Sequence, residues 1–155
     1  MFRGQYEHAI DGKGRTSVPA KFRDVLDAEG HLSASGGRLI LTRGLEPCLV
    51  CWPLREWTMF EERLAKLPQF DASVAMIRRI YVSGAVDLEV DKLGRVLVPK
   101  ELRDAAGLSR DALWAGMGRH IELWSKERFD ALRTAVLTDE AKRADVAARL
   151  AELGL

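Results

Sequence analysis

Short apolar segments separated by turn residues alternate along this chain with longer segments of helical spacing. Segments that contain β-branched residues, several of them next to an aspartate or a glycine, predict strands. The predicted strands cover residues 6–10, 15–18, 39–41, 48–52, 85–90, 95–98 and 121–124. Apolar residues three and four positions apart, with proline or serine at several starts, predict helices over residues 20–26, 54–67, 73–82, 100–106, 126–137 and 138–153. This mixture indicates an α+β fold.

The sequence also repeats itself. When it is shifted by 80 positions, residues 4–24 fall on residues 84–104 and share eight of 21 positions. A second match follows at a shift of 72, where Trp52 falls on Trp124. The change of shift from 80 to 72 places eight additional residues in the first copy, around residues 30–44. Because two copies are too few for a solenoid, we expect a pseudo-twofold pair that shares one core.

Each copy contains an aspartate, a glycine and an arginine at the same spacing in a predicted turn. These residues are Asp11, Gly14 and Arg15 in the first copy and Asp91, Gly94 and Arg95 in the second. Glycine permits positive φ, and aspartate accepts hydrogen bonds from free N–H groups of a turn. We therefore expect an ion pair to fix each hairpin. For the arginines a ligand role stays open, because guanidinium groups also suit phosphate oxygens and guanine edges.

The net charge is too small to indicate a partner by itself. The 155 residues contain 24 Lys+Arg and 23 Asp+Glu, a net charge of +1, so a polyanion would need a local basic patch. The first 23 residues supply one, since five basic and two acidic residues give a local charge of +3. The basic residues are Arg3, Lys13, Arg15, Lys21 and Arg23.

Several classes of protein do not fit this sequence. No apolar run reaches the roughly 18 residues of a membrane helix, and the first residues do not resemble a secretory signal. Two cysteines are too few for a disulfide framework, so we expect a reducing cytoplasm. Cys48 and Cys51 would lie on opposite faces of a strand, which favours core packing over a redox or zinc site.

No catalytic or metal site is expected either. The three histidines, His8, His31 and His120, are too far apart in the sequence to suggest a zinc site. A small enzyme would need a nucleophile or an acid–base set, and neither these nor a phosphate-binding glycine loop is found. We therefore predict no catalytic residue, no cofactor, no metal and no small-molecule substrate.

The two turn motifs resemble a known family. Residues 11–23 and 91–103 each carry Asp, Gly-Arg, Val-Pro and a final Arg, which resembles the AbrB-like swapped-hairpin DNA-binding signature. Two such copies about 80 residues apart, after an opening Phe-Arg-Gly, resemble the MraZ family of bacterial transcriptional regulators. The likeness covers essentially the whole chain. It implies two tandem AbrB-like βαβ-type repeats that form a pseudo-twofold swapped-hairpin barrel flanked by helices.

The resemblance also implies boundaries and a function. The repeats would span residues 4–53 and 83–125, with connecting helices over 54–82 and C-terminal helices over 126–155. The family is associated with the division and cell-wall gene cluster. Its members assemble into rings and bind regularly spaced direct repeats in double-stranded DNA upstream of their own operon, typically as repressors. We expect the same activity here, in the cytoplasm at the nucleoid, without a membrane partner.

The implied DNA-binding residues belong mainly to the first copy. They are Lys13, Arg15 and Arg3, with Arg23, Lys21 and Arg95 as further candidates. Residues 85–103 hold four basic and four acidic residues, and Leu93 replaces Lys13, so we expect the second copy to act more as architecture. The alternative is an AbrB-like antitoxin that binds both DNA and a protein.

Overall fold

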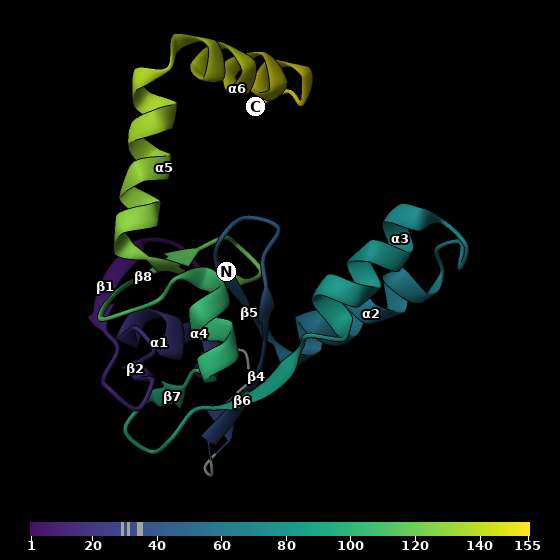
Figure 1. The fold of residues 1–155 in the computed structure, drawn as a ribbon. Coiled ribbons are helices and arrows are strands. Elements are labelled where there is room, and N and C mark those ends of the chain that lie inside the picture. Colours follow the sequence, from purple (N-terminus) through teal and green to yellow (C-terminus); the bar gives the residue numbers. More distant parts are fainter. Residues whose placement is uncertain (29, 31, 34–35) are drawn as a thin grey trace.

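Two strand-rich halves, each followed by helices, make up the chain (Figure 1). The computed structural model describes residues 1–28, 30, 32–33 and 36–155. The first half contains β1 (Gln5–Ala9), β2 (Arg15–Ser17), α1 (Ala20–Ala28), β3 (Leu32–Ser33), β4 (Gly36–Arg43), β5 (Leu49–Pro53), α2 (Leu54–Ala65), α3 (Ala72–Ile77) and the π-helical turn η1 (Arg78–Val82). The second contains β6 (Val86–Glu89), β7 (Arg95–Leu97), α4 (Lys100–Ala106), β8 (Asp111–Gly116), β9 (Ile121–Ser125), α5 (Lys126–Thr138) and α6 (Glu140–Glu152). The α+β class is therefore confirmed.

The two halves exchange strands. In the larger sheet β1 pairs with β8, β6 pairs with β4, and β5 pairs with β9, all antiparallel. A separate two-stranded ribbon joins β2 to β7. Each of these four pairings links one copy of the repeat to the other, so neither copy completes its own sheet.

The sheet stays open rather than closing into a barrel. Its path runs β1-β8-β9-β5-β4, and both β3 and β6 pair with β4. No pairing in the described part of the chain joins β1 back to β6. The predicted closed swapped-hairpin barrel is thus not found, although the exchange of strands about the central β5–β9 pair gives the expected pseudo-twofold arrangement.

Two strands were absent from the sequence prediction, the two-residue β3 and the longer β8. β8 covers Asp111–Gly116, and its residues 112–115 are all buried. A strand covered on both faces has no alternation of polar and apolar residues, and alanine is a weak strand former. The region around residues 30–44, where eight additional residues were expected, contains β3 and the whole of β4. His31 in this region lies outside the described residues.

The main core lies between the sheet and the β2–β7 ribbon and is shared by both copies. Its buried side chains include Phe22, Val98 and Trp114. Cys51 belongs to this core, whereas Cys48 belongs to a smaller cluster on the other face of the sheet. The predicted opposite orientation of the two cysteines is confirmed, and burial raises the pKa of each thiol to about 12.

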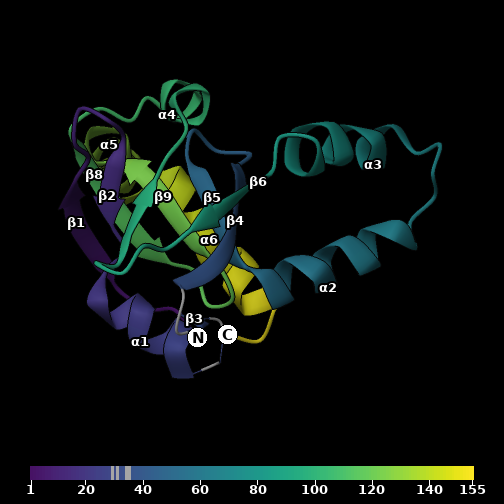
Figure 2. The same ribbon diagram turned by 90° about the horizontal axis from the view of Figure 1, so that it is seen from below.

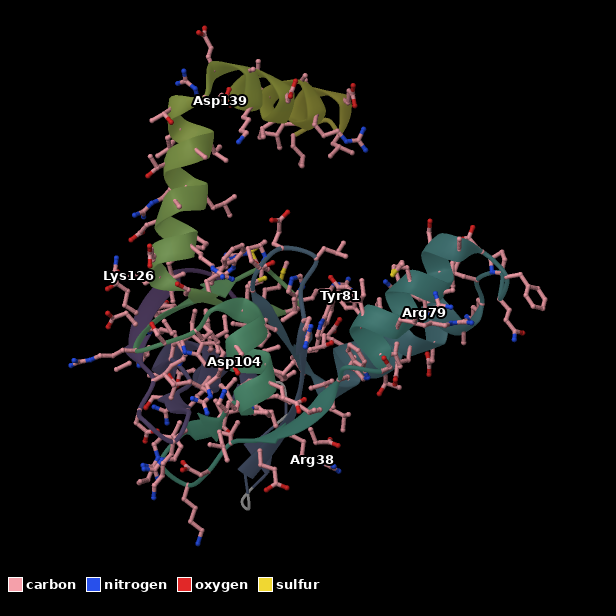
Figure 3. The ribbon with its side chains drawn as sticks, viewed as in Figure 1. Arg38, Arg79, Tyr81, Asp104, Lys126 and Asp139 are labelled. Carbon is pink, nitrogen blue, oxygen red and sulfur yellow. The ribbon has the colours of Figure 1, made fainter. Side chains whose placement is uncertain are left out.

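The helices after each repeat extend away from the sheet. Figures 1 and 2 show α2 and α3 as one arm, and Figure 1 shows α5 and α6 as another. Lys126, at the foot of α5, pairs with Asp130 at 2.7 Å and with Glu7 of β1 at 3.3 Å. Asp139 stands at the corner between α5 and α6, where its side chain accepts from the Lys142 N–H (Figure 3). Helix α6 therefore begins after Asp139 and not at Thr138. In the described residues no helix is both long and apolar enough to cross a membrane.

Candidate nucleic-acid interface

The first turn motif is a closed network around Asp11. Asp11 Oδ1 accepts from the backbone N–H groups of Lys13 and Arg15, each at 2.9 Å. Arg15 Nε donates to Asp11 Oδ2 at 2.8 Å. These hydrogen bonds from Arg15, the backbone one first, lower the pKa of the Asp11 carboxyl to about 2. The turn closes at Gly14, whose φ of +89° strongly favours glycine.

The second motif repeats this network. Asp91 Oδ1 accepts from the N–H groups of Leu93 and Arg95 at 2.9 Å, and Arg95 Nε donates to Asp91 Oδ2 at 3.0 Å. The Arg95 backbone hydrogen bond is the main cause of a lowered Asp91 pKa. The predicted ion pairs are confirmed in both copies. Each is about two-fifths exposed rather than buried, so its guanidinium lies at the surface.

The β2–β7 ribbon places the two arginines on one face. Arg15 lies opposite Leu97, and Ser17 lies opposite Arg95, in the antiparallel register. Directly opposed residues point to the same side of a sheet, and alternate residues share a face. The residues between them, Thr16 and Val96, are buried against the core. Arg15 and Arg95 therefore share the outer face of the ribbon, whose strands β2 and β7 are labelled at the lower left of Figure 1.

The two turns are also locked to one another. The Val18 N–H donates to Gly94 O, and the Val98 N–H donates to Gly14 O, both at 2.9 Å. Each turn is thus held by the other copy. These hydrogen bonds are symmetric and do not distinguish the copies, so the expected division of roles between a DNA-contacting first copy and an architectural second copy stays a prediction.

Arg23 lies in the seam between the copies. Its side chain is half-buried, and its Nε donates to Val18 O at 3.2 Å. It covers Gly94 so closely that a Cβ there would lie 2.6 Å from Arg23 Nη1. Arg103 covers Gly14 in the same way. Both arginines therefore stabilise the pairing of the turns.

A hollow lies beside the two surface arginines. It has a volume of about 370 Å³ and is lined by Arg15, Glu89, Val90, Asp91, Lys92, Arg95, Val96 and Leu97. Lys92 is exposed and adds a basic residue that the sequence analysis missed. It was missed because the alignment of the two repeats matches Lys13 with Leu93, whereas the lysine of the second turn is one position earlier, at Lys92.

The other basic candidates lie apart from this face. Arg3 adjoins the turn between β8 and β9, where Gly4 O accepts from the Gly116 N–H at 2.9 Å. The five residues of β1 separate Arg3 from the Asp11 turn along the chain, and a DNA contact by Arg3 stays a prediction. Lys21 is exposed in the first turn of α1. The structure thus brings Arg15, Lys92 and Arg95 together beside one hollow, with Lys13 in the turn next to Arg15.

Comparison with known proteins identifies the family. A family model described as "MraZ protein, putative antitoxin-like" matches residues 1–80 and again residues 81–152. The chain belongs to the MraZ family. The two matches meet between residues 80 and 81 of this MraZ-family chain, within η1 and a few residues before the second strand-rich half.

Individual relatives agree with this assignment. A protein of Acidovorax sp. (strain JS42), named "Transcriptional regulator MraZ", is 45% identical over 140 residues, which are 90% of this chain and 93% of the relative. A protein of the same name from Acetivibrio thermocellus is 38% identical over the whole of both chains. The solution structure of PHS018 from Pyrococcus horikoshii covers 79% of this chain and 88% of its own, with a TM-score of 0.33 and 17% identity. A likeness that weak carries no argument about the fold.

Proposed function

We propose that this MraZ-family chain is a transcriptional regulator that binds double-stranded DNA through the outer face of the β2–β7 ribbon. The observation that carries the proposal is the placement of Arg15 and Arg95 on that one face, with the exposed Lys13 and Lys92 in the adjoining turns. In the contacts of the described residues, each ion pair with aspartate uses Nε. The terminal guanidinium nitrogens are then suited to phosphate oxygens or to guanine edges.

The aspartates orient these arginines more than they neutralise them. A bonded guanidinium loses less side-chain freedom when it meets DNA than a free one does, so preorganisation favours binding. Asp11, Asp91 and Glu89 nevertheless offset part of the positive charge at this surface. One chain therefore contacts few phosphates, and its affinity alone is low.

Assembly of several chains raises this low affinity for DNA. We propose, from the family resemblance, that the chain forms a ring and binds regularly spaced direct repeats upstream of its own operon. On this proposal it represses the division and cell-wall gene cluster and works at the nucleoid in the cytoplasm. Several identical ribbons bound to one DNA raise the effective concentration of each, provided that the spacing of the repeats matches that of the subunits.

Fluorescence anisotropy on labelled DNA from upstream of the gene tests the proposal. Arg15→Ala and Arg95→Ala are compared with the wild type over a salt series, with Arg55→Ala on the exposed face of α2 as the matched loss of one arginine. We expect both ribbon variants to weaken binding by roughly tenfold or more per site and to flatten the salt dependence. Arg55→Ala should bind as the wild type does.

The outcomes separate the two copies. If Arg15→Ala loses binding and Arg95→Ala does not, the first copy alone contacts DNA, as the distribution of charge in the sequence predicts. If both variants stay folded and assembled and still bind normally, the β2–β7 ribbon does not contact DNA. A wild type that binds no such fragment at any salt concentration would refute the DNA-binding proposal.

The antitoxin alternative is favoured by one observation, the description of the matching family model as antitoxin-like. Such a protein needs a surface for its partner. Helix α6 exposes the apolar side chains of Val146 and Leu150, and Leu153 just after the helix is exposed as well. An antitoxin would restore growth to cells that express a toxic protein encoded beside it. A regulator without this activity would change only transcription.

A further inference from the structure

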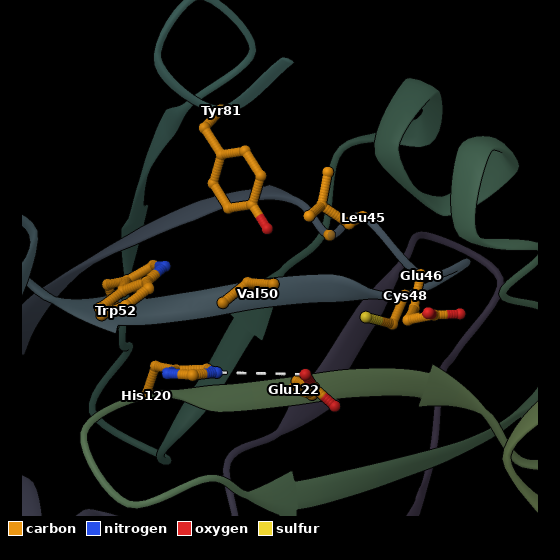
Figure 4. Close-up of a pocket in the computed structure, with 9 residues that line it drawn as sticks. Leu45, Glu46, Cys48, Val50, Trp52, Tyr81, His120 and Glu122 are labelled. Carbon is orange, nitrogen blue, oxygen red and sulfur yellow. Dashed lines mark ion pairs between the residues drawn. The ribbon is translucent and has the colours of Figure 1, made fainter. Parts of the chain in front are cut away.

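A second hollow lies on the face of the sheet opposite the main core (Figure 4). Its volume is about 150 Å³, which is enough for a group the size of benzene. The lining residues come from the β4–β5 connection, β5, η1 and the start of β9: Gly44, Leu45, Glu46, Cys48, Val50, Trp52, Tyr81, His120 and Glu122. It is unconnected with the β2–β7 ribbon.

The hollow is not a by-product of the internal repeat. Trp52 and Trp124 occupy matching positions, but Trp124 is buried beside Phe129 of α5. Trp52 instead stacks on His120, with ring centroids 4.5 Å apart. Tyr81 completes the wall from η1, and its carbonyl accepts from the buried Thr42 Oγ1 at 2.7 Å. A π-helical turn of this kind often marks a functional site.

The side chains around the hollow carry only negative charge at neutral pH. Burial lowers the pKa of His120, so its ring is neutral. Burial also raises the pKa of the Cys48 thiol to about 12 and raises the pKa of Tyr81, so both remain protonated. Glu46 and Glu122 are the remaining ionisable groups of this lining, and no lysine or arginine belongs to it.

Glu122 is held so that one oxygen faces the hollow. Its Oε2 accepts from Trp124 Nε1 at 2.8 Å, while its Oε1 lies 4.0 Å from His120 Nε2. Figure 4 shows this oxygen joined to His120 by the dashed line, with Val50 on the neighbouring strand. A carboxylate oxygen beside a neutral imidazole offers acceptors to an N–H-rich cation, and Val50 offers an apolar surface to its carbon stem.

We propose that this hollow binds the ammonium or guanidinium head of an organic cation, with Glu122 Oε1 as the main acceptor. The Tyr81 ring adds attraction for a positive charge. The cation has two possible sources, a free small molecule or a lysine or arginine side chain from another copy of the chain. Both present the same head group to Glu122.

Fluorine NMR of the full chain labelled with 5-fluorotryptophan tests this site directly. The Trp52 signal is assigned with Trp52→Phe, and the probes are n-butylguanidinium, n-butylammonium and the uncharged isostere n-butylurea. We expect at least one cation to shift the Trp52 signal saturably and n-butylurea to leave it in place. Glu122→Gln keeps an acceptor for Trp124 and should weaken cation binding by about tenfold or more. Glu127→Gln, an exposed carboxylate outside the hollow, should bind as the wild type does.

The results also distinguish the source of the cation. If no free cation shifts the signal but Glu122→Gln, still folded by circular dichroism, lowers the number of subunits measured by light scattering, the side chain of another copy is the ligand. The proposal is overturned if neither effect occurs, or if n-butylurea binds as tightly as the cations. Because DNA binding is measured separately at the ribbon, failure here leaves the proposed regulator intact.

Discussion

At the scale of single residues, the aspartate of the first turn makes the stability of the fold depend on pH. The Asp11 carboxylate accepts three hydrogen bonds from its turn, and its pKa falls from 3.8 to about 2. A carboxyl whose folded pKa is depressed stabilises the fold above the unfolded pKa and loses that effect as the pH falls through the folded value. The contribution of Asp11 is therefore complete at neutral pH and disappears between about pH 4 and pH 2.

We expect Asp11→Asn to remove this part of the acid sensitivity. Thermal midpoints measured from pH 7 to pH 2 should fall less steeply below pH 4 in the variant, which starts from a lower midpoint at pH 7. The exposed Glu152→Gln, paired with Arg149 on α6, controls for loss of a surface ion pair. Parallel curves for the wild type and Asp11→Asn would contradict the role of this carboxyl.

The close approach of Arg23 to Gly94 gives a second prediction at this scale. Gly94 has a φ of +75°, and an added Cβ would meet the Arg23 guanidinium. Gly94→Ala should cost about 1 kcal/mol or more from backbone strain alone, and the contact adds to this. If Arg23→Ala relieves the contact, the double variant loses less free energy of unfolding than the sum of the single variants. If the losses of the two single variants in urea unfolding simply add up in the double variant, the Arg23 side chain moves away from the new Cβ and the contact costs nothing.

At the scale of elements, the β2–β7 ribbon contains an asymmetry that can be tested. Thr16 and Val96 lie opposite one another in its buried face, and Thr16 Oγ1 has no hydrogen-bond partner among the described residues. A buried hydroxyl without a partner costs roughly 1 to 3 kcal/mol. Thr16→Val makes the pair symmetric and should raise the free energy of unfolding by about 1 kcal/mol. A loss of stability, with Val96→Thr as the reverse control, would indicate that the hydroxyl is satisfied.

The sequence predicted these elements unevenly, for physical reasons. Both Asp–Arg turns and the strands beside them could be predicted, because aspartate, glycine and arginine determine local geometry within five residues. β8 was missed because its buried run lacks alternation. The grouping of Arg15 with Arg95 could not be predicted from charge counts, since it depends on pairing between strands 80 positions apart.

At the scale of the whole molecule, the exchange of strands makes each half depend on the other. β1 is paired with β8, β2 with β7, β4 with β6 and β5 with β9, so in a fragment of residues 1–80 four strands lack a partner. Unpaired strand edges and the apolar face beneath them are costly in water. The two copies have closely similar turn motifs, however, so a second fragment can provide the missing strands.

We therefore expect residues 1–80 alone to be unfolded as a monomer and to gain strand structure only by forming a dimer. Mixing them with residues 81–155 should favour the heterodimer, because the natural pairing keeps Phe2, Trp114 and Val98 in one core. Circular dichroism with light scattering over a concentration series measures both properties. In the control, the full chain cleaved between residues 80 and 81 should stay assembled under native conditions. A folded monomeric fragment would mean that each repeat can complete its own sheet, contrary to the observed exchange.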